Sequence, residues 1–502
     1  MTTGNFLNEK KPLLKERSQG NGELEIANHA EHRESTYMFH AKPWRHFRRP
    51  FYHSVLLLSL LAFWWALSRY TRYTPPKTSN VTALLADLEY DIQMMAIDRM
   101  AQHKGCSSVV ASRDRQFDFN FTGDGSAANR WQLLDSSVPE SRKNFQGQVT
   151  VDKGDRSQVS DMEVHVIISS SDEKDLDNVH LHKSDSVLNI DYEFRDNSEV
   201  CTQVQILVLL RPEPKRSLDW FDIQTSIFDI TFKSELGWEI NNLRTHTSHG
   251  DLWMDGQNAL DPLIAHNVSH SSIDGVIFGW FVPDETLALH NEEGGIGVFL
   301  HPMLAEDVPW DPKNISVSTV SGRIQVGLYY NLWPARVYTH RTTIESVSGW
   351  ISARVPHGVH TNISSITNNI TTAIHPYWGT DPDSLNSTRW TNEIHTTSSG
   401  DSSVLLYNPP KKSLHEHYNP LFNTLSTHEA GEGELWVTYP FEWWGSMKGK
   451  TEHGKLEFDG SLLRDVKRGE GSVAAKRGAK GESWMEAHIT TGALNIQLGL
   501  RD

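Results

Sequence analysis

The sequence is poor in cysteine, in long apolar runs and in positive charge. Only two of its 502 residues are cysteines, so it is not a small domain held together by many disulfides. Its apolar residues are not gathered into repeated long runs, which excludes a multi-span membrane protein. Lys and Arg total 47 against 63 Asp and Glu, for a net charge of −16, and this argues against general nucleic-acid binding, which needs a basic surface.

One charge-free stretch, Phe51–Ser68, contains the run VLLLSLLAFWWAL. As a helix it would be about 27 Å long, close to the roughly 30 Å of a bilayer's hydrocarbon core. A buried core helix would show a polar face, and a cleaved signal peptide would not usually follow such a long polar leader. We therefore expect a disordered cytosolic tail over 1–50 and a transmembrane anchor over 51–70, with the lipid bilayer as a partner.

Sequons for N-glycosylation all follow this stretch. They begin at Asn80, Asn120, Asn267, Asn314, Asn362, Asn369 and Asn386. Such sites are modified only on the lumenal or extracellular side of a membrane. We therefore expect a single-pass protein of the plasma membrane or secretory pathway, with its C-terminal part lumenal or extracellular.

The two cysteines, Cys106 and Cys201, lie in this C-terminal part. An oxidising compartment would allow them to form a disulfide, and the alternative is two unpaired thiols. Two cysteines without histidine partners cannot make a zinc site.

The apolar period changes along the C-terminal part. Leu84, Leu88, Ile92 and Met95 follow helical spacing, which predicts a juxtamembrane helix over 78–104. From about residue 115 the period is two, and strands are predicted at 117–121, 148–151, 163–168, 188–194, 204–210 and 221–232. The region 115–500 is therefore expected to be mostly β.

A short unit recurs in this β region: a Ser/Thr-rich strand, a Gly or Asn, one variable residue and usually an aliphatic residue. The turn positions are Gly250, Gly275, Gly322, Gly349, Asn368, Gly400, Gly454 and Gly492. A sharp turn that needs positive φ would explain Gly and Asn there, and the aliphatic residue would point inward.

The spacing of these turns predicts the fold. The shorter intervals between them match one coil of a solenoid, and the longer ones would be one coil with an inserted loop, or two coils. Coils must stack to bury their apolar faces. We expect an all-β solenoid, a single-stranded β-helix-like array, with inserted loops at 283–313, 375–392 and 408–433 and a basic loop at 464–483. The alternative is a β-sandwich with similar hairpin turns.

The segments VSTVSGRIQV, IESVSGWISARV, ISSITNNITTAI and HITTGALNIQLG resemble the bacterial "putative adhesin" domain family, related to the auto-transporter adhesins. The resemblance covers roughly residues 219–500. It implies a β-solenoid and brings no catalytic residues. Together with the N-terminal anchor and the Trp-rich outer region, the chain looks like the fungal, membrane-anchored members.

Motifs for catalysis and metal binding are scarce. The sequence has no G-x-S-x-G elbow, P-loop, H-E-x-x-H or Rossmann glycine pattern. The pairs His180/His182 and His415/His417 place two imidazoles on one face of a strand, but zinc needs three or four ligands. We therefore expect no metal or other cofactor.

Two acidic residues, Asp251 and Asp274, could form a glycosidase pair on adjacent coils. The alternative is that they are turn residues that accept backbone hydrogen bonds.

Aromatic residues offer the stronger functional hypothesis. Trp436, Tyr439, Trp443 and Trp444 cluster in ELWVTYPFEWWG, where exposed rings could stack on sugars or anchor a protein interface. Buried rings that fill the end of the solenoid are the alternative. The sequence thus favours a membrane-anchored, non-catalytic, adhesin-like protein that binds a glycan or a protein. A glycan-active enzyme on a β-helix and a structural spacer remain as alternatives.

Overall fold

The computed structural model describes residues 106, 109–121, 129–137, 145–193, 200–214, 216–233, 236–255, 263–301, 312–328, 339–376, 392–408, 421, 423–478 and 483–500. All of them belong to the compact unit Pro75–Asp502. The expected tail 1–50, anchor 51–70 and helix 78–104 lie outside the described residues. Among the residues that are described, none lies in a helix with the length and apolar character to cross a bilayer.

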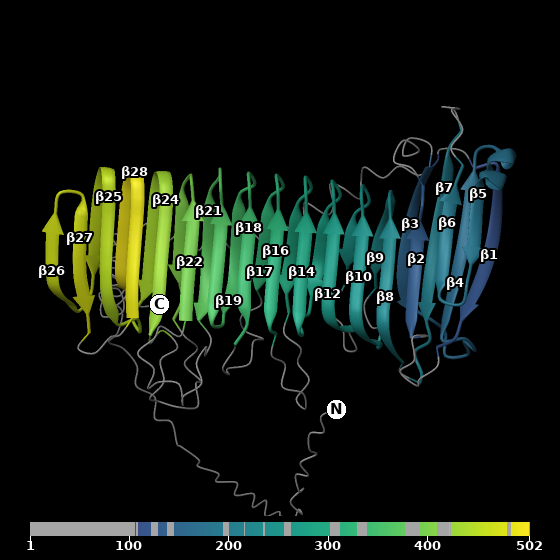
Figure 1. Cartoon of the computed structure of the whole chain (residues 1–502), viewed down its shortest axis with the longest axis horizontal. Coiled ribbons are helices and arrows are strands. Elements are labelled where there is room, and N and C mark those ends of the chain that lie inside the picture. The colour runs from purple at the N-terminus through teal and green to yellow at the C-terminus, as the bar shows by residue number, and fades with distance from the viewer. Residues whose placement is uncertain are drawn as a thin grey trace, which may run out of the picture. The chain divides into compact units, whose positions relative to one another are not determined.

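The prediction of an all-β protein is confirmed, because the described chain consists of strands and one short 3-10 helix (Figure 1). The first elements are β1 (Ala111–Phe119), β2 (Arg130–Asp135), β3 (Phe145–Lys153), β4 (Met162–Ser170), the 3-10 helix η2 (Glu173–Asn178), β5 (Val179–Lys183), β6 (Val187–Tyr192) and β7 (Thr202–Leu210).

The central strands alternate between two sheets, each built of parallel strands. They are β8 (Ser217–Thr225), β9 (Phe228–Phe232), β10 (Glu239–Thr247), β11 (Leu252–Met254), β12 (Ile264–Ser272), β13 (Ile277–Phe281), β14 (Thr286–Asn291), β15 (Ile296–Leu300), β16 (Asn314–Thr319), β17 (Ile324–Leu328), β18 (Arg341–Ser346), β19 (Ile351–His357), β20 (His360–Ser365), β21 (Ile370–Pro376), β22 (Asn392–Ser398) and β23 (Ser402–Leu406). The even-numbered strands form the first sheet and the odd-numbered strands form the second. Each coil thus contributes one strand to each sheet, which is a solenoid-like arrangement.

The core lies between the two sheets and is built in register. Leu252, Ile277, Ile296, Ile324 and Ile351 are successive partners along the second sheet, and each is buried. They are the aliphatic residues that follow the turn positions, so the expectation that these side chains point inward is confirmed. Stacking of identical side chains lets each coil bury its apolar edge against the coils on either side.

The structure contains a turn, at Gly294, that the repeat pattern did not predict. Gly294 lies between Gly275 and Gly322, and β14 and β15 flank it. The interval between Gly275 and Gly322 is therefore two coils, and most of the expected insertion at 283–313 is instead a regular coil. The turn was missed because Asn291, rather than Ser or Thr, opens it.

The expected reason for glycine at these turns is wrong at most of them. Of the predicted positions, only Gly454 and Gly492 have positive φ, at 155° and 128°. Elsewhere the limit is space: a Cβ on Gly275 would overlap the carbonyl oxygen of Gly250, and one on Gly349 would overlap that of Gly322. Close approach of backbones between coils therefore selects glycine.

At five of the turn glycines, Gly250, Gly275, Gly294, Gly322 and Gly349, a side chain three residues earlier also accepts a hydrogen bond from the glycine N–H. The acceptors are Thr247, Ser272, Asn291, Thr319 and Ser346. Asn368 occupies the equivalent position between Gly349 and Gly400, and its side-chain amide donates to the Ser348 carbonyl of the preceding coil at 3.0 Å. The polar half of the repeat thus satisfies backbone groups that the turns would otherwise leave unpaired.

The C-terminal strands close the array. They are β24 (Thr424–Pro440), β25 (Gly445–Gly460), β26 (Leu463–Gly469), β27 (Ser472–Arg477) and β28 (Ser483–Leu500). The last strand, β28, inserts in parallel between β24 and β25 (Figure 1). The region 464–483 was expected to be a loop, but β26 and β27 form an antiparallel hairpin there, because Val473 and Ala475 alternate as buried residues.

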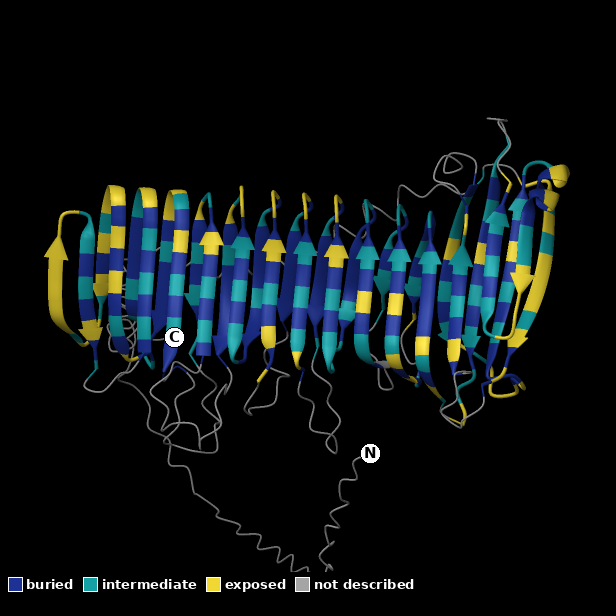
Figure 2. Cartoon of the chain, viewed as in Figure 1, coloured by how far each residue is buried: buried dark blue, intermediate teal, exposed yellow. Residues whose placement is uncertain are grey.

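The edge strands are strongly charged. Exposed residues dominate β1 and β26 in Figure 2, whereas central strands of the first sheet such as β16 and β20 alternate buried and partly exposed residues. Arg113 and Arg115 lie on β1, and Arg464, Lys467 and Arg468 lie on β26. Charged edges discourage pairing with further strands, so the edges at β1 and β26 are protected against pairing with another sheet.

Candidate functional site

The structure corrects the predicted aromatic patch. Tyr439 and Trp443 are 0% exposed, so neither can contact a ligand at the surface. The alternation of β24 directs Tyr439 inward, where its hydroxyl lies 2.9 Å from His428 Nε2. Trp443 packs edge-on against Tyr439, with ring centroids 5.2 Å apart. Both rings fill the interior, as the alternative interpretation proposed.

The other two residues of the predicted patch do not form a shared surface with them. Trp436 is partly buried, and its indole N–H donates to Glu434 at 2.7 Å. Trp444 is 41% exposed, and Gly478 lies against its ring. A single partly exposed indole is common at protein surfaces and does not define a binding site.

The two cysteines are joined in the structure by a disulfide between Cys106 and Cys201. The bond ties the chain before β1 to the start of β7. Gln146, at the start of β3, places its side-chain amide beside both sulfurs. The disulfide therefore fixes the N-terminal strands to one another.

The sequons fall into two groups. Asn120 and Asn369 are exposed, whereas Asn267, Asn314 and Asn362 are partly buried on strands of the first sheet. The amides of Asn267 and Asn362 donate to Asn241 O and Glu345 Oε1. Asn80 and Asn386 lie outside the described residues.

The acidic pair considered for glycosidic cleavage has other roles. One carboxylate oxygen of Asp251 accepts the Val276 N–H of the next coil at 2.7 Å, and Asp274 lies 3.0 Å from His249 Nδ1. The Asp229 carboxylate likewise accepts the Asp251 N–H at 2.8 Å. The Asp251 contact fits the interpretation of a turn residue that accepts a backbone hydrogen bond, whereas the Asp274 carboxylate contacts a histidine side chain.

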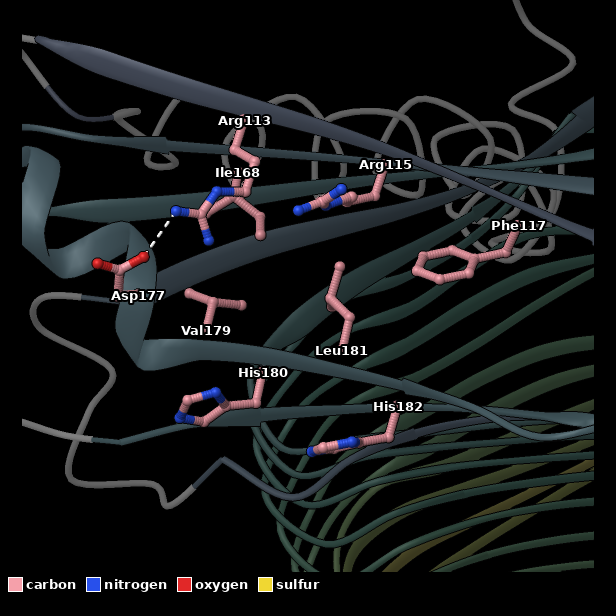
Figure 3. Close-up of a pocket in the computed structure, with 9 residues that line it drawn as sticks. All are labelled: Arg113, Arg115, Phe117, Ile168, Asp177, Val179, His180, Leu181 and His182. Carbon is pink, nitrogen blue, oxygen red and sulfur yellow. Dashed lines mark hydrogen bonds and ion pairs between the residues drawn. The ribbon is translucent and has the colours of Figure 1, made fainter.

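A cavity of about 540 Å³ lies at the N-terminal end of the two sheets. In the described residues, β1 pairs only with β4 and β5 pairs only with β6, so each is an edge strand of its sheet. The cavity lies between these two edges, beside η2, and Figure 3 shows its lining. The lining residues are Arg113, Arg115, Phe117, Ile168, Asp177, Val179, His180, Leu181 and His182.

A buried network holds η2 in place beside the cavity. Asp175 is 3% exposed, and it accepts hydrogen bonds from Asn178 and Thr202 and, at 3.1 Å, from the Tyr192 hydroxyl. Asp172 caps the helix through the Lys174 N–H. The helix is therefore anchored, and Asp177 is presented at the cavity rim.

The polar lining of the cavity carries an excess of positive charge. Arg113 is paired with Asp177 at 2.7 Å and also donates to the Leu176 carbonyl at 3.3 Å (Figure 3). The Arg115 guanidinium has no ion pair or hydrogen bond with any described residue, and the residue is exposed. The rings of His180 and His182 project to the same side, with centroids 6.4 Å apart. Within the lining, the Asp177 carboxylate thus faces two guanidinium groups and two imidazoles, and the exposed carboxylate of Glu193 lies 3.6 Å from His180 Nε2.

The sequence analysis predicted part of this site. The pair His180/His182 was predicted to share one face, and both rings line the cavity, whereas His415 and His417 lie outside the described residues. Arg113 and Arg115 were missed because β1 begins before the predicted strand 117–121. The alternation R-x-R-x-F over 113–117 was the available signal, since period two places these residues on one face.

The outer face of the first sheet is a second polar surface. Side chains on neighbouring coils bond to one another there, as in His246 with Ser271 and His290 with Ser318, both at 2.9 Å. Thr286 likewise donates to Asn267 at 2.8 Å. These contacts repeat at the spacing of parallel strands and hold the polar side chains in fixed positions.

No protein-family model matches the chain, and no curated protein matches it. Among solved structures, the chain is similar to one described as a "putative cell adhesion protein" from Clostridium sporogenes ATCC 15579. The identity is 9% and the TM-score is 0.15, with 77% of this chain and 100% of that chain covered. At these values the likeness assigns neither a family nor a function to this chain.

Proposed function

We propose that this is a non-catalytic, adhesin-like protein whose β-array presents the cavity between β1 and β5 to an anionic ligand, an acidic glycan above all. The observation that carries the proposal is the unpaired guanidinium of Arg115 beside His180 and His182 in a concave site. A planar guanidinium binds carboxylate or sulfate groups through two parallel hydrogen bonds. Phe117 and Leu181 supply apolar surface against which a sugar ring can lie.

The same proposal includes membrane attachment. The apolar segment 51–70 would hold the β-array at a lumenal or extracellular surface. Deletion of residues 51–68 is expected to move the protein from the membrane fraction to the soluble fraction. A deletion variant that stays in the membrane fraction after a carbonate wash would overturn the anchor without touching the proposal for the cavity.

The binding test uses the full chain in detergent micelles. An oligogalacturonate hexamer is the acidic probe, maltohexaose the neutral probe and a hexaglutamate peptide the non-sugar anion. Isothermal titration is expected to show binding of oligogalacturonate and at least tenfold weaker binding of maltohexaose. Arg115→Gln is expected to weaken oligogalacturonate binding at least tenfold, since a charge-assisted bidentate contact is lost.

The matched control is Arg156→Gln, which removes the same charge from an exposed turn between β3 and β4. Equal loss in the two variants would mean that general charge attraction explains binding, and the cavity would be rejected as the site. Binding of hexaglutamate without oligogalacturonate would reject the glycan and keep the cavity. Turnover of either sugar would reject the non-catalytic assignment in favour of the enzyme alternative.

A further inference from the structure

Two histidines and a glutamate gather on the outer face of the first sheet. His360 lies on β20, and Glu393 and His395 lie on β22, the next strand of the sheet. His360 and Glu393 are register partners, and His395 follows Glu393 by two residues on the same face. Among the described residues, this is the group whose three potential ligand atoms all lie within 4.8 Å of one another.

The distances between these atoms approach those around a bound ion. His360 Nδ1 lies 3.3 Å and His395 Nε2 lies 3.9 Å from Glu393 Oε2. Around a tetrahedral ion with bonds of about 2.0–2.2 Å, neighbouring ligand atoms are about 3.3–3.6 Å apart. Small side-chain rotations would therefore bring all three atoms to one ion. The side chains of His360, Glu393 and His395 are 23%, 44% and 29% exposed, so an ion can reach them from solvent.

A neighbouring strand orients one of the imidazoles. Thr427 on β24 places its hydroxyl 2.6 Å from His395 Nδ1, so Nε2 is the nitrogen that faces Glu393. A partner of this kind fixes the orientation of a metal-binding histidine.

Other histidines on this face lack the arrangement. His266 lies between Glu239 and Asp284, but these carboxylates contact opposite ring nitrogens and cannot share one ion with a single imidazole. His246 and His290 each bond a serine of the next coil through Nδ1. Among the residues that the structure describes, the close grouping of two imidazole nitrogens and one carboxylate is thus particular to His360, Glu393 and His395.

We propose that His360, Glu393 and His395 bind one divalent transition-metal ion, Zn²⁺ in preference to others, with the fourth coordination position left to water. Two nitrogens and one carboxylate suit zinc, whereas calcium and magnesium prefer oxygen ligands alone. The site is independent of the cavity between β1 and β5 and of any ligand bound there.

The test is equilibrium dialysis of the full chain in detergent micelles against Zn²⁺, with Ca²⁺ in a parallel arm. The expected result is one tightly bound Zn²⁺ per chain and no Ca²⁺ at the same concentration. In the double variant His360→Gln/His395→Gln, the affinity of this site is expected to fall at least 100-fold. Thr427→Val, which removes only the orienting hydroxyl, is expected to weaken Zn²⁺ about 10–100-fold.

The matched control is His290→Gln, which removes an imidazole from the same face that is bonded to a serine in the same way as His395 to Thr427. Its affinity for Zn²⁺ should equal that of the parent. The proposal is overturned if His360→Gln/His395→Gln still binds one Zn²⁺ with parent affinity, or if His290→Gln loses as much. Replacement of Zn²⁺ by Co²⁺ gives a second readout, because tetrahedral Co²⁺ with these ligands would show visible absorption that the double variant lacks.

Discussion

Gly275 lies so close to Gly250 of the preceding coil that a Cβ atom on Gly275 would overlap the Gly250 carbonyl oxygen. The same relationship links Gly294 to Gly275, Gly322 to Gly294 and Gly349 to Gly322. The coils therefore stack backbone on backbone at this corner, and a side chain there would push neighbouring coils apart.

The first prediction follows from this contact. Gly322→Ala is expected to lower the free energy of unfolding by about 1–3 kcal/mol, because the overlapping atom is backbone and cannot rotate away. Guanidinium denaturation followed by tryptophan fluorescence measures the change. The control is Gly469→Ala on the exposed strand β26, where the new methyl group would meet only the Ser472 hydroxyl. Equal losses at the two positions would contradict the explanation.

Acid should destabilise the protein through its buried histidines. Burial lowers the pKa of His270, His357, His375 and His428 to about 3. The unfolded chain binds these protons near the ordinary histidine pKa of about 6.5, whereas the folded chain does not. This loss of folding stability is absent above about pH 6.5, and it grows progressively as the pH falls from 6.5 toward 3.

The measurement is the free energy of unfolding between pH 7.5 and 4.5, which should decline with decreasing pH. His270→Gln removes one of the four groups, so its plot of stability against pH should be shallower by about one proton. A plot for His270→Gln that runs parallel to the parent would refute the assignment.

The adjacent tryptophans Trp443 and Trp444 should differ strongly in their effect on stability. Trp443 is 0% exposed and packs on Tyr439, so Trp443→Ala should cost about 3–5 kcal/mol. Trp444 is 41% exposed, so Trp444→Ala should cost about 1 kcal/mol or less. Thermal unfolding of the two variants side by side checks this, and similar costs would place the two rings in similar environments.

Loss of the disulfide should destabilise the N-terminal strands. The bond between Cys106 and Cys201 spans 95 residues, a loop whose closure contributes about 4 kcal/mol in the chain-entropy model. Cys106→Ser/Cys201→Ser should therefore unfold at a lower guanidinium concentration than the oxidised parent. Intact mass before and after alkylation shows whether the parent is oxidised. A parent with two free thiols under oxidising conditions would contradict the predicted bond.

The repeat units in the sequence led to the correct class of fold, because the apolar residue after each turn is dictated by local geometry that recurs in every coil. For this reason the sequence predicted the inward orientation of the aliphatic residues, and all of them are buried: Leu252, Ile277, Ile324, Ile351 and Ile370. The turn at Gly294 was not predicted, because it opens with Asn291 and not with Ser or Thr. The hairpin of β26 and β27 was predicted as a loop, because a charged, glycine-rich segment resembles a loop unless its strand pairing is known.

The candidate sites were much harder to predict. Trp443 and Trp444 are identical residues at adjacent positions. Only the folded structure shows that the first ring is buried and the second is partly exposed. Arg113 comes into reach of His180 because two edge strands distant in sequence border one cavity. The group His360, Glu393 and His395 depends on the register between β20 and β22.

The alternation of strands, the inward aliphatic ladder and the polar turns can be predicted from the amino-acid order, since each is a local pattern repeated from coil to coil. The two cysteines were also evident as a candidate pair. Which aromatic rings are buried, why the turns need glycine and which charged side chains meet became evident only from the folded structure. Those outcomes depend on the register between coils and on which strands form the edges, and both are set by contacts between residues far apart in the chain.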